Sequence, residues 1–182
     1  MKAQSPTSRQ SGFTIIEIIV TLIILAILSA MIMSRFSGGN DFNGVIIRDQ
    51  LVSLIRNGRQ LSLGRADVSI ELEPDGAGEN LSVITRDNGG VVNTTVLDMD
   101  SVGLSGDVNE TDDCATTNGG NNITNGSTFT LNFGDLGDLD ASGVTGSEVA
   151  VTSALRVCID NTPNISVCVS PAGFAYVGNC DV

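Results

Sequence analysis

A single glutamate interrupts the long apolar run near the start of the chain. The run covers residues 12–33, GFTIIEIIVTLIILAILSAMIM, and Glu17 is its sixth residue. An ionised carboxylate at membrane depth costs about 2.5–3.5 kcal/mol or more, so a chain keeps one there only with a purpose or a partner. A cut between Gly12 and Phe13 would place a new ammonium one helical turn from Glu17, and a neighbouring copy would supply the same cation. The run therefore predicts an apolar helix that uses Glu17 to meet other copies of the chain.

The start of the run resembles the processing site of type IV pilins and of the related pseudopilins of type II secretion. A short basic leader ends in Gly12, and Phe13, Thr14, two apolar residues, Glu17 and an apolar stretch follow in register. The resemblance implies that a prepilin peptidase in the membrane cuts after Gly12 and methylates the amine of Phe13. It also implies that Glu17 of an incoming subunit pairs with the Phe13 amine of a subunit already in a filament.

Two plainer interpretations of this segment are a secretory signal peptide and a simple membrane anchor. A signal peptide places its apolar core directly after the basic region and ends in a small-residue cleavage site, whereas here Glu17 interrupts the start. The run also reaches about the 20 residues that a transmembrane helix needs. A simple anchor explains that length but neither the carboxylate nor the Gly12-Phe13-Thr14 junction.

The rest of the chain divides into a second helix and a β-rich head. The expected parts are a leader over residues 1–12, a transmembrane or filament-core helix over 13–36, a hinge with an amphipathic helix over 37–64, and a head over 65–182. Gly38-Gly39 predicts a weak point between the helices, or an ordinary linker. One face of the second helix should pack on the sheet, with Gly58 allowing close approach; its members are Ile47, Leu51, Leu54, Ile55, Gly58 and Leu61. Val45 and Val52 lie nearer a row of arginines, Arg48, Arg56 and Arg59, which is either a solvated flank or a surface for acidic heads of neighbours.

Short β-prone stretches separated by turn residues predict an antiparallel sheet in the head. The fold class expected is therefore α+β, with a long N-terminal helix packed on a β-sheet head, as in type IV pilins. The expected strands cover residues 68–73, 81–86, 91–97, 128–133, 149–159, 165–169 and 174–177, with turns at Asp75-Gly76, Asn88-Gly89 and Ser170 to Gly173. Residues 98–126 are poor in apolar side chains and predict a long surface loop.

Three closely spaced carboxylates, Asp135, Asp138 and Asp140, are weak candidates for calcium, because hard cations favour clustered oxygen ligands in glycine-bearing loops. The run matches neither an EF-hand loop nor the nonapeptide calcium repeat. A solvated turn is the preferred interpretation, and no metal site and no cofactor are expected.

The four cysteines lie in the expected head and favour two disulfides, since spacing of the CxxC kind is missing. Three connectivities are open. If residues 161–164 form a hairpin turn, Cys158 lies opposite Cys168, and Cys114 would pair with Cys180. Free thiols are the alternative.

The amino-acid composition argues against two classes of function, nucleic-acid binding and catalysis. The chain has 21 Asp plus Glu against nine Lys plus Arg, for a net charge of −12. Such a charge argues against capture of nucleic acid, so a DNA-uptake pilin is disfavoured. With no histidine and few cysteines, the chain offers little material for a zinc or nucleophile–base site, so an enzyme is not expected.

Within the pilin family, the resemblance is nearest to minor pilins and H-type pseudopilins, and in particular to minor pilin C of mannose-sensitive haemagglutinin (MSHA) pili. It is carried by Arg48 to Leu51, by Leu54-Ile55-Arg56, by Arg59 to Leu61 and by the turn at Ser170 to Gly173. It implies a minor subunit for pilus assembly and adhesion, held in the inner membrane with a periplasmic head and then moved to a pilus. Its partners would be other pilins, the peptidase and the assembly platform. A type II secretion pseudopilin and a membrane-anchored binding protein are the alternatives.

Overall fold

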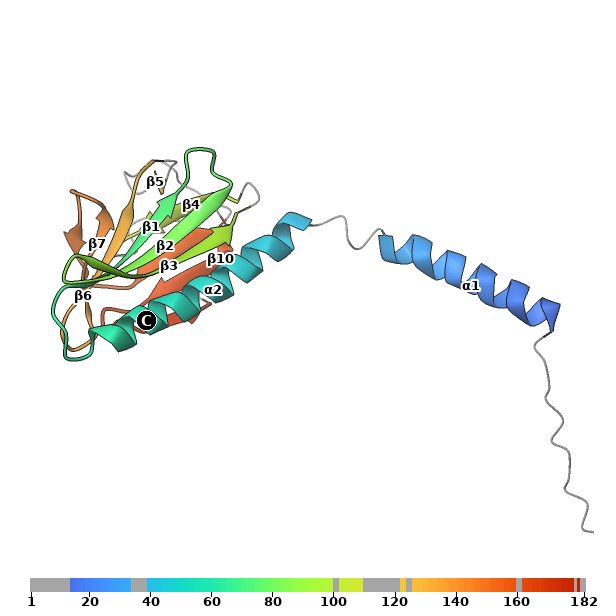
Figure 1. Cartoon of the computed structure of the whole chain (residues 1–182), viewed down its shortest axis with the longest axis horizontal. Coiled ribbons are helices and arrows are strands. Elements are labelled where there is room, and N and C mark those ends of the chain that lie inside the picture. The colour runs from blue at the N-terminus through green and yellow to red at the C-terminus, as the bar shows by residue number, and fades with distance from the viewer. Residues whose placement is uncertain are drawn as a thin grey trace, which may run out of the picture. The chain divides into compact units, whose positions relative to one another are not determined.

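The computed structural model describes residues 14–33, 39–99, 102–109, 122–123, 126–159, 162–178 and 180. The chain divides into two compact units, residues 1–39 and residues 40–182. Each unit is described by itself. The first contains one helix, and the second contains the second helix and the sheets (Figure 1).

The first helix, α1, covers Ile15–Met33. The side chains of its residues 15–29 are exposed all along the helix, because no other described residue of the first unit packs against them. A helix that is apolar on every side is normally buried in a membrane or in a larger assembly. The isolated chain therefore leaves α1 without the surroundings that its sequence requires.

The second helix, α2, covers Gly39–Ser62 and packs on the sheets through the predicted face. Ile47, Leu51 and Ile55 are at most 1% exposed, and Val52 is also buried. Gly58 lies directly over Ile70 of the sheet: a Cβ atom at Gly58 would lie 2.8 Å from Ile70 Cγ1. The predicted close approach at Gly58 is confirmed.

Six strands form the first sheet, in the order β3-β2-β1-β6-β7-β8. All neighbouring pairs are antiparallel. Asn88, with φ 51°, and Gly89, with φ 77°, form the predicted turn between β2 and β3, where positive φ at both positions suits a tight hairpin. The strands are β1 (Val68–Pro74), β2 (Asn80–Asp87), β3 (Gly90–Asp98), β6 (Phe129–Phe133), β7 (Leu139–Val144) and β8 (Val149–Ala150).

The other five strands form a second antiparallel sheet, in the order β11-β10-β9-β4-β5. The strands are β4 (Leu104–Asp107), β5 (Asn122–Ile123), β9 (Leu155–Ile159), β10 (Thr162–Val169) and β11 (Ala175–Val177). The predicted turn at Ser170 to Gly173 joins β10 to β11 and is closed by a hydrogen bond from Gly173 N to Ser170 O of 2.8 Å.

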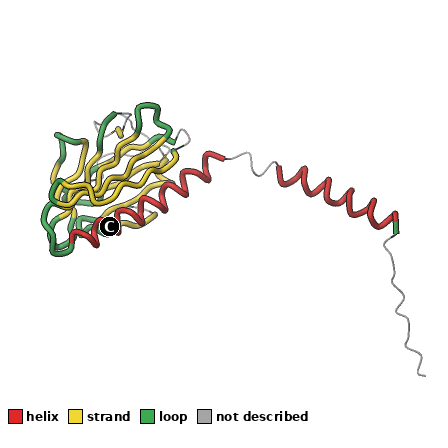
Figure 2. The backbone as a smooth tube through the Cα atoms, in the orientation of Figure 1, coloured by secondary structure: helices red, strands yellow, loops and turns green. Residues whose placement is uncertain are grey.

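One hydrophobic core joins α2 to both sheets. Figure 2 shows α2 running beside the strands of the second unit. Phe129 of the first sheet reaches the second sheet, because a Cβ atom at Gly106 in β4 would lie 2.6 Å from Phe129 Cζ. The α+β class, with a helix packed on antiparallel sheets, is confirmed and is consistent with a pilin-like fold.

The described residues between 98 and 126 do not form the surface loop that the composition predicted. They contain β4 and β5, and Met99, Val102, Leu104, Val108 and Ile123 are all at most 4% exposed. The apolar residues in this segment are few, but they lie where the second sheet and the core need them. Two other boundaries differ: the predicted strand 149–159 is two strands, β8 and β9, and β7 was missed because its sequence, LDASGV, has little β propensity.

Gly58→Val is expected to lower the free energy of unfolding by about 2–3 kcal/mol, because overpacking a dense core typically costs that much. Ile70 cannot move aside easily, since it is 0% exposed. Urea unfolding of the detergent-solubilised chain measures the change. Ser53→Val at an exposed site on the same helix is the matched control and should shift stability by less than about 0.5 kcal/mol. Equal effects at both sites would contradict close packing at Gly58.

Candidate functional site

The first turn of α1 holds the carboxylate that the sequence singles out. Glu17 follows Thr14 by three residues, and its backbone N–H donates to Thr14 O at 3.1 Å and lies 3.4 Å from Thr14 Oγ1. Thr14 is therefore the N-cap of α1, and Thr-x-x-Glu is the pattern of a capping box. The sequence analysis missed this local role of Glu17, although Thr14 and Glu17 stand at the spacing that signals it.

The helix dipole gives a second physical reason for an acidic residue at position 17. A negative charge in the first turn of a helix is typically worth 0.3–1 kcal/mol through the helix dipole. That gain is smaller than the cost of about 2.5–3.5 kcal/mol for a charge at membrane depth. Capping alone therefore would not offset the cost of a charge at membrane depth. Gly12 and Phe13, the residues on either side of the predicted cleavage site, lie outside the described residues.

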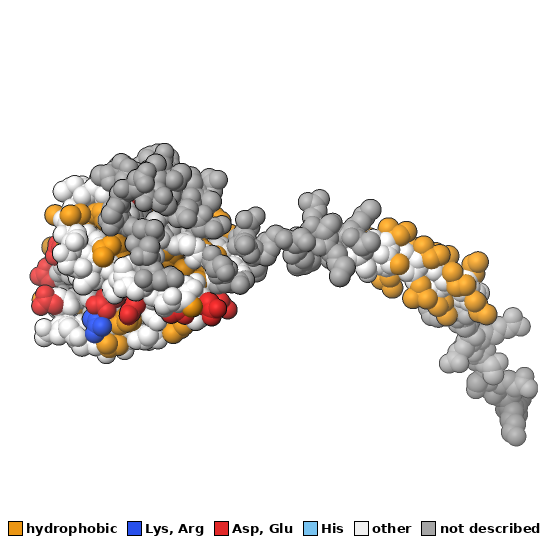
Figure 3. All heavy atoms as spheres, turned by 90° about the horizontal axis from the view of Figure 1, so that it is seen from above, with side chains coloured by type: hydrophobic (Ala, Val, Ile, Leu, Met, Phe, Trp, Pro, Cys, Tyr) orange, Lys and Arg blue, Asp and Glu red, His pale blue; other side chains and the backbone are white. Residues whose placement is uncertain are grey.

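Figure 3 shows apolar side chains along the visible face of α1. Its large side chains from Ile15 to Leu28 are 48–79% exposed, with no buried stripe among them. Exposed apolar surface of this extent marks a site of membrane or protein association. Among the residues that the structure describes, neither helix meets the length and hydropathy that a membrane crossing requires.

A family model, the prokaryotic N-terminal methylation motif, matches residues 7–33. The chain carries the hallmark of type IV pilins and pseudopilins. The match includes Gly12, Phe13 and Glu17 and ends at the last residue of α1. For this pilin-like chain, the motif implies cleavage by prepilin peptidase, anchoring in a membrane before assembly, and assembly into filaments with other pilins. Neither a curated protein nor a solved structure matches the chain.

Two arginines of α2, Arg56 and Arg59, contact the head of the same chain. Arg56 Nε donates to Ala175 O at 2.8 Å, and Arg59 Nε donates to Ala172 O at 3.1 Å. The guanidinium of Arg59 also lies 3.8 Å from the ring centroid of Phe174. These contacts attach α2 to β11 and to the turn that precedes it, a role that the sequence did not predict for Arg56 and Arg59.

The disulfide of the described residues joins Cys168 to Cys180, with Cα atoms 5.3 Å apart. The predicted pairs Cys158–Cys168 and Cys114–Cys180 are therefore wrong. Cys158 is also disulfide-bonded, and Cys114 lies outside the described residues.

A register shift explains the error. The hairpin prediction placed residues 162–164 in a loop, but β10 begins at Thr162, and an irregularity between Thr162 and Ser166 places Ser166 opposite Cys158 and Arg156 opposite Cys168. Cys158 and Cys168 are then diagonal neighbours, about 7–8 Å apart, which is too far for a disulfide. The chain after β11 instead returns Cys180 to Cys168, beside Ala154 and Tyr176.

Replacing both Cys168 and Cys180 by alanine is expected to lower the free energy of unfolding by about 2–4 kcal/mol, because the disulfide closes a loop in the unfolded chain. The two residues are 12 apart in sequence. Urea unfolding under oxidising conditions gives the difference. A variant with the unfolding midpoint of the parent chain would show that this bond does not stabilise the head.

The three carboxylates considered for calcium lie in the turn between β6 and β7 and at the start of β7. Within the described part of the chain, no group of three or more acidic, cysteine or histidine side chains is arranged to hold a metal ion. Asp138 Oδ1 and Asp140 Oδ2 both face Gly134, at 2.7 and 3.2 Å from where its Cβ would lie. Desolvation of its carboxyl group raises the pKa of Asp140, and the carboxylates of Asp138 and Asp135 raise it further.

Asp140→Asn is expected to stabilise the folded chain at pH 7 and to have little effect near pH 3. Because the folded pKa of Asp140 is raised above 3.8, ionising this carboxyl group costs more in the folded state than in the unfolded chain, so stability falls as pH rises from 3.8 through the folded pKa. Asparagine does not ionise, so the variant avoids the free-energy cost of a charged carboxylate at this position. Urea midpoints measured from pH 3 to pH 7 give the difference.

Asp75→Asn is the matched control, because it should act with the opposite sign. A hydrogen bond from Asn80 Nδ2 at 2.9 Å is the main cause that lowers the pKa of Asp75. Its contribution is present above pH 3.8 and is lost as pH falls through the folded pKa. Asp75→Asn should therefore destabilise at pH 7 and converge with the parent chain at low pH. The same sign for both variants would contradict these environments.

Proposed function

We propose that this chain is a non-enzymatic minor subunit of an MSHA-like type IV pilus, with a role in pilus assembly and cell adhesion. The observation that carries the proposal is α1, whose apolar side chains are exposed on every side and whose first turn holds one carboxylate. In a filament, the α1 helices of many subunits bury one another. The head then forms the outer surface.

Glu17 is the assembly residue in this proposal. After cleavage between Gly12 and Phe13, the methylated amine of Phe13 is a cation at the edge of the apolar core. The Glu17 carboxylate of an incoming subunit pairs with that amine on a subunit already in place. Because both charges leave water together, a missing partner is costly: an uncompensated buried charge typically costs 3–5 kcal/mol.

In this proposal, the anchor and the head have defined locations before and after assembly. Before assembly, residues 13–36 anchor the subunit in the inner membrane, with the head on the periplasmic side, where the Cys168–Cys180 disulfide forms readily. An assembly platform in the inner membrane then inserts the subunit into the filament. The net charge of −12 suits a soluble head surface outside the cell.

The test is the distribution of the protein between sheared surface filaments and membranes, in cells carrying the parent chain or Gly12→Leu. We expect the parent chain in filaments together with other pilins, and the uncleaved variant in membranes alone. A parent chain in a periplasmic filament that pushes secreted proteins would replace the pilus with a type II secretion pseudopilus. A parent chain found in membranes alone would leave an anchored binding protein.

A further inference from the structure

Strand β3 lies at the edge of the first sheet and is uncharged from Gly90 to Leu97. Among the strands that the structure describes, β3 pairs with β2 alone. The sequence from Gly90 to Leu97, GVVNTTVL, contains no charged residue and no proline. Val91, Val92 and Val96 are 57%, 54% and 60% exposed. Long apolar edges of this kind readily pair with another strand, and many proteins block them with lysine or proline.

Five arginines of the second unit contact groups of their own chain. Arg48 binds Asp49, Arg65 binds Asp87, Arg86 binds Glu71, and Arg56 and Arg59 donate to backbone carbonyls. Two copies of so acidic a chain repel each other wherever carboxylates face carboxylates. β3 is a surface on which two copies meet without that repulsion.

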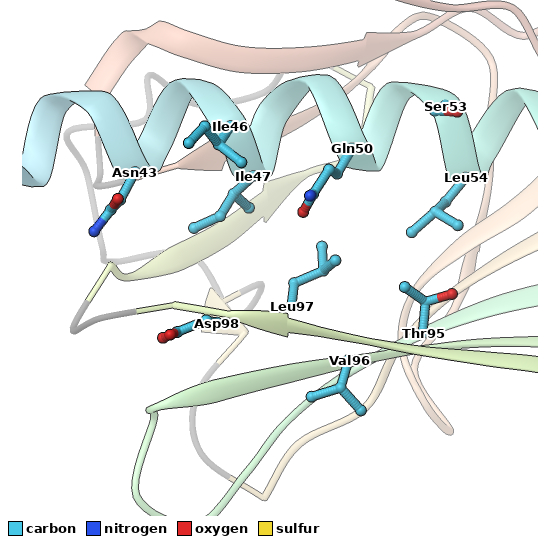
Figure 4. Close-up of a pocket in the computed structure, with 10 residues that line it drawn as sticks. All are labelled: Asn43, Ile46, Ile47, Gln50, Ser53, Leu54, Thr95, Val96, Leu97 and Asp98. Carbon is cyan, nitrogen blue, oxygen red and sulfur yellow. The ribbon is translucent and has the colours of Figure 1, made fainter.

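A groove of about 480 Å³ lies between β3 and α2. In Figure 4, Leu97 and Thr95 point toward the helix and Val96 points away from it. The α2 side of the groove includes Ile46, which is 39% exposed, and Leu54. A strand added to the edge of β3 would place every second side chain on the face of the sheet that carries this groove.

We propose that β3 pairs antiparallel with β3 of a second copy, about a two-fold axis at Thr95. An irregularity in the β2–β3 pairing, between Thr85 and Arg86, leaves Asn93 to Asp98 as the regular part of the strand. With Thr95 opposite Thr95 of the second copy, Val96 faces Thr94 and Leu97 faces Asn93. No charged residue then faces another, and Thr–Thr pairs are favourable across strands.

This contact is different from the one that builds a filament. A two-fold contact uses the same surface on both copies, so the assembly is complete as a dimer. A filament needs contacts between two different surfaces, which allow further subunits to be added. Pairing through β3 therefore joins two subunits of separate filaments, or two subunits before assembly. It requires neither Glu17 nor cleavage after Gly12, so its failure is distinguishable from failure of the proposed function.

Cysteine cross-linking of the detergent-solubilised full chain tests the register. Thr95→Cys should form a covalent dimer under mild oxidation, because the two sulfurs meet at the axis. Thr94→Cys and Val96→Cys should each cross-link weakly alone and strongly when the two variants are mixed. Val149→Cys, at the exposed opposite edge of the same sheet, is the matched control and should remain monomeric on a denaturing gel.

A lysine at the edge gives an independent measurement. Val96→Lys should weaken association about tenfold or more in sedimentation of the solubilised chain, since charge on an edge strand blocks pairing, while Val149→Lys should leave it unchanged. Cross-linking of Val149→Cys as efficient as that of Thr95→Cys would overturn the proposal. So would strong self-cross-linking of Val96→Cys without its mixed partner, or association unaffected by Val96→Lys.

Discussion

Glu17→Gln is expected to remove the protein from sheared filaments while leaving the helix cap intact. Glutamine still completes a capping box with Thr14, so the local structure of α1 is kept. It has no charge to pair with the Phe13 amine, and an ammonium left alone in an apolar core typically costs 3–5 kcal/mol. An effect of that size lowers incorporation by two orders of magnitude or more, at about 1.4 kcal/mol per factor of ten.

Two control variants separate the charge of Glu17 from its capping role. Thr14→Ala removes the cap, at a typical cost of about 1 kcal/mol, but keeps the carboxylate, so the variant should still enter filaments. Thr21→Ala removes another hydroxyl of α1, which donates to Ile18 O at 2.8 Å, and should also assemble. The measurement is the amount of each variant in filaments and in membranes, by quantitative immunoblot. Assembly of Glu17→Gln at the parental level would show that the carboxylate serves the cap alone.

Phe129→Ala is expected to cost about 3–5 kcal/mol of unfolding free energy, as for other buried phenylalanines. The ring is 0% exposed and fills the space against Gly106 of the facing sheet. Removing it leaves a cavity between the two sheets at a point where both contribute to one core. Because small domains are stable by only 5–15 kcal/mol, the variant should be degraded or should fail to reach filaments.

Phe174→Ala provides the comparison for the same change of side chain. Phe174 is 56% exposed and contacts the guanidinium of Arg59. Its loss should cost about 0.5–1 kcal/mol, the value of an exposed cation–π contact. Urea unfolding of both variants in detergent gives the two numbers. A Phe129→Ala variant no less stable than Phe174→Ala would contradict the packing between the sheets.

The helices could be predicted from sequence because their signals are local and periodic. Ile47, Leu51 and Ile55 recur on one face at helical spacing, and the structure buries all three. The hairpin of β2 and β3 was equally accessible, since Asn88-Gly89 is a strong turn signal between two β-prone runs.

The second sheet was harder to predict because its order depends on distant contacts. β4 lies in a polar segment, and its pairing with β9 gives it a place that its own sequence does not signal. The disulfide was mispaired for a related reason. The register of β10 shifts between Thr162 and Ser166, and one shift of this kind changes which cysteines approach.

The key residue of the candidate site could be predicted from the sequence, but its local contacts were not. Glu17 stands out by its charge alone, and the methylation motif at residues 7–33 agrees with that selection. The capping contact between Glu17 and Thr14 was not predicted, although the Thr-x-x-Glu spacing at the start of α1 signals it. The roles of Arg56 and Arg59 could not be predicted from the sequence, because their acceptors, Ala175 O and Ala172 O, lie more than 100 residues away in the chain.

The most direct test is the intact mass of the protein recovered from sheared filaments. We predict a chain that begins at Phe13, carries one added methyl group and lacks residues 1–12. That mass would establish a processed pilin subunit that has left the membrane for a filament. A full-length or unmethylated chain, recovered from membranes and absent from filaments, would contradict the assignment of Gly12, Phe13 and Glu17 to pilus assembly.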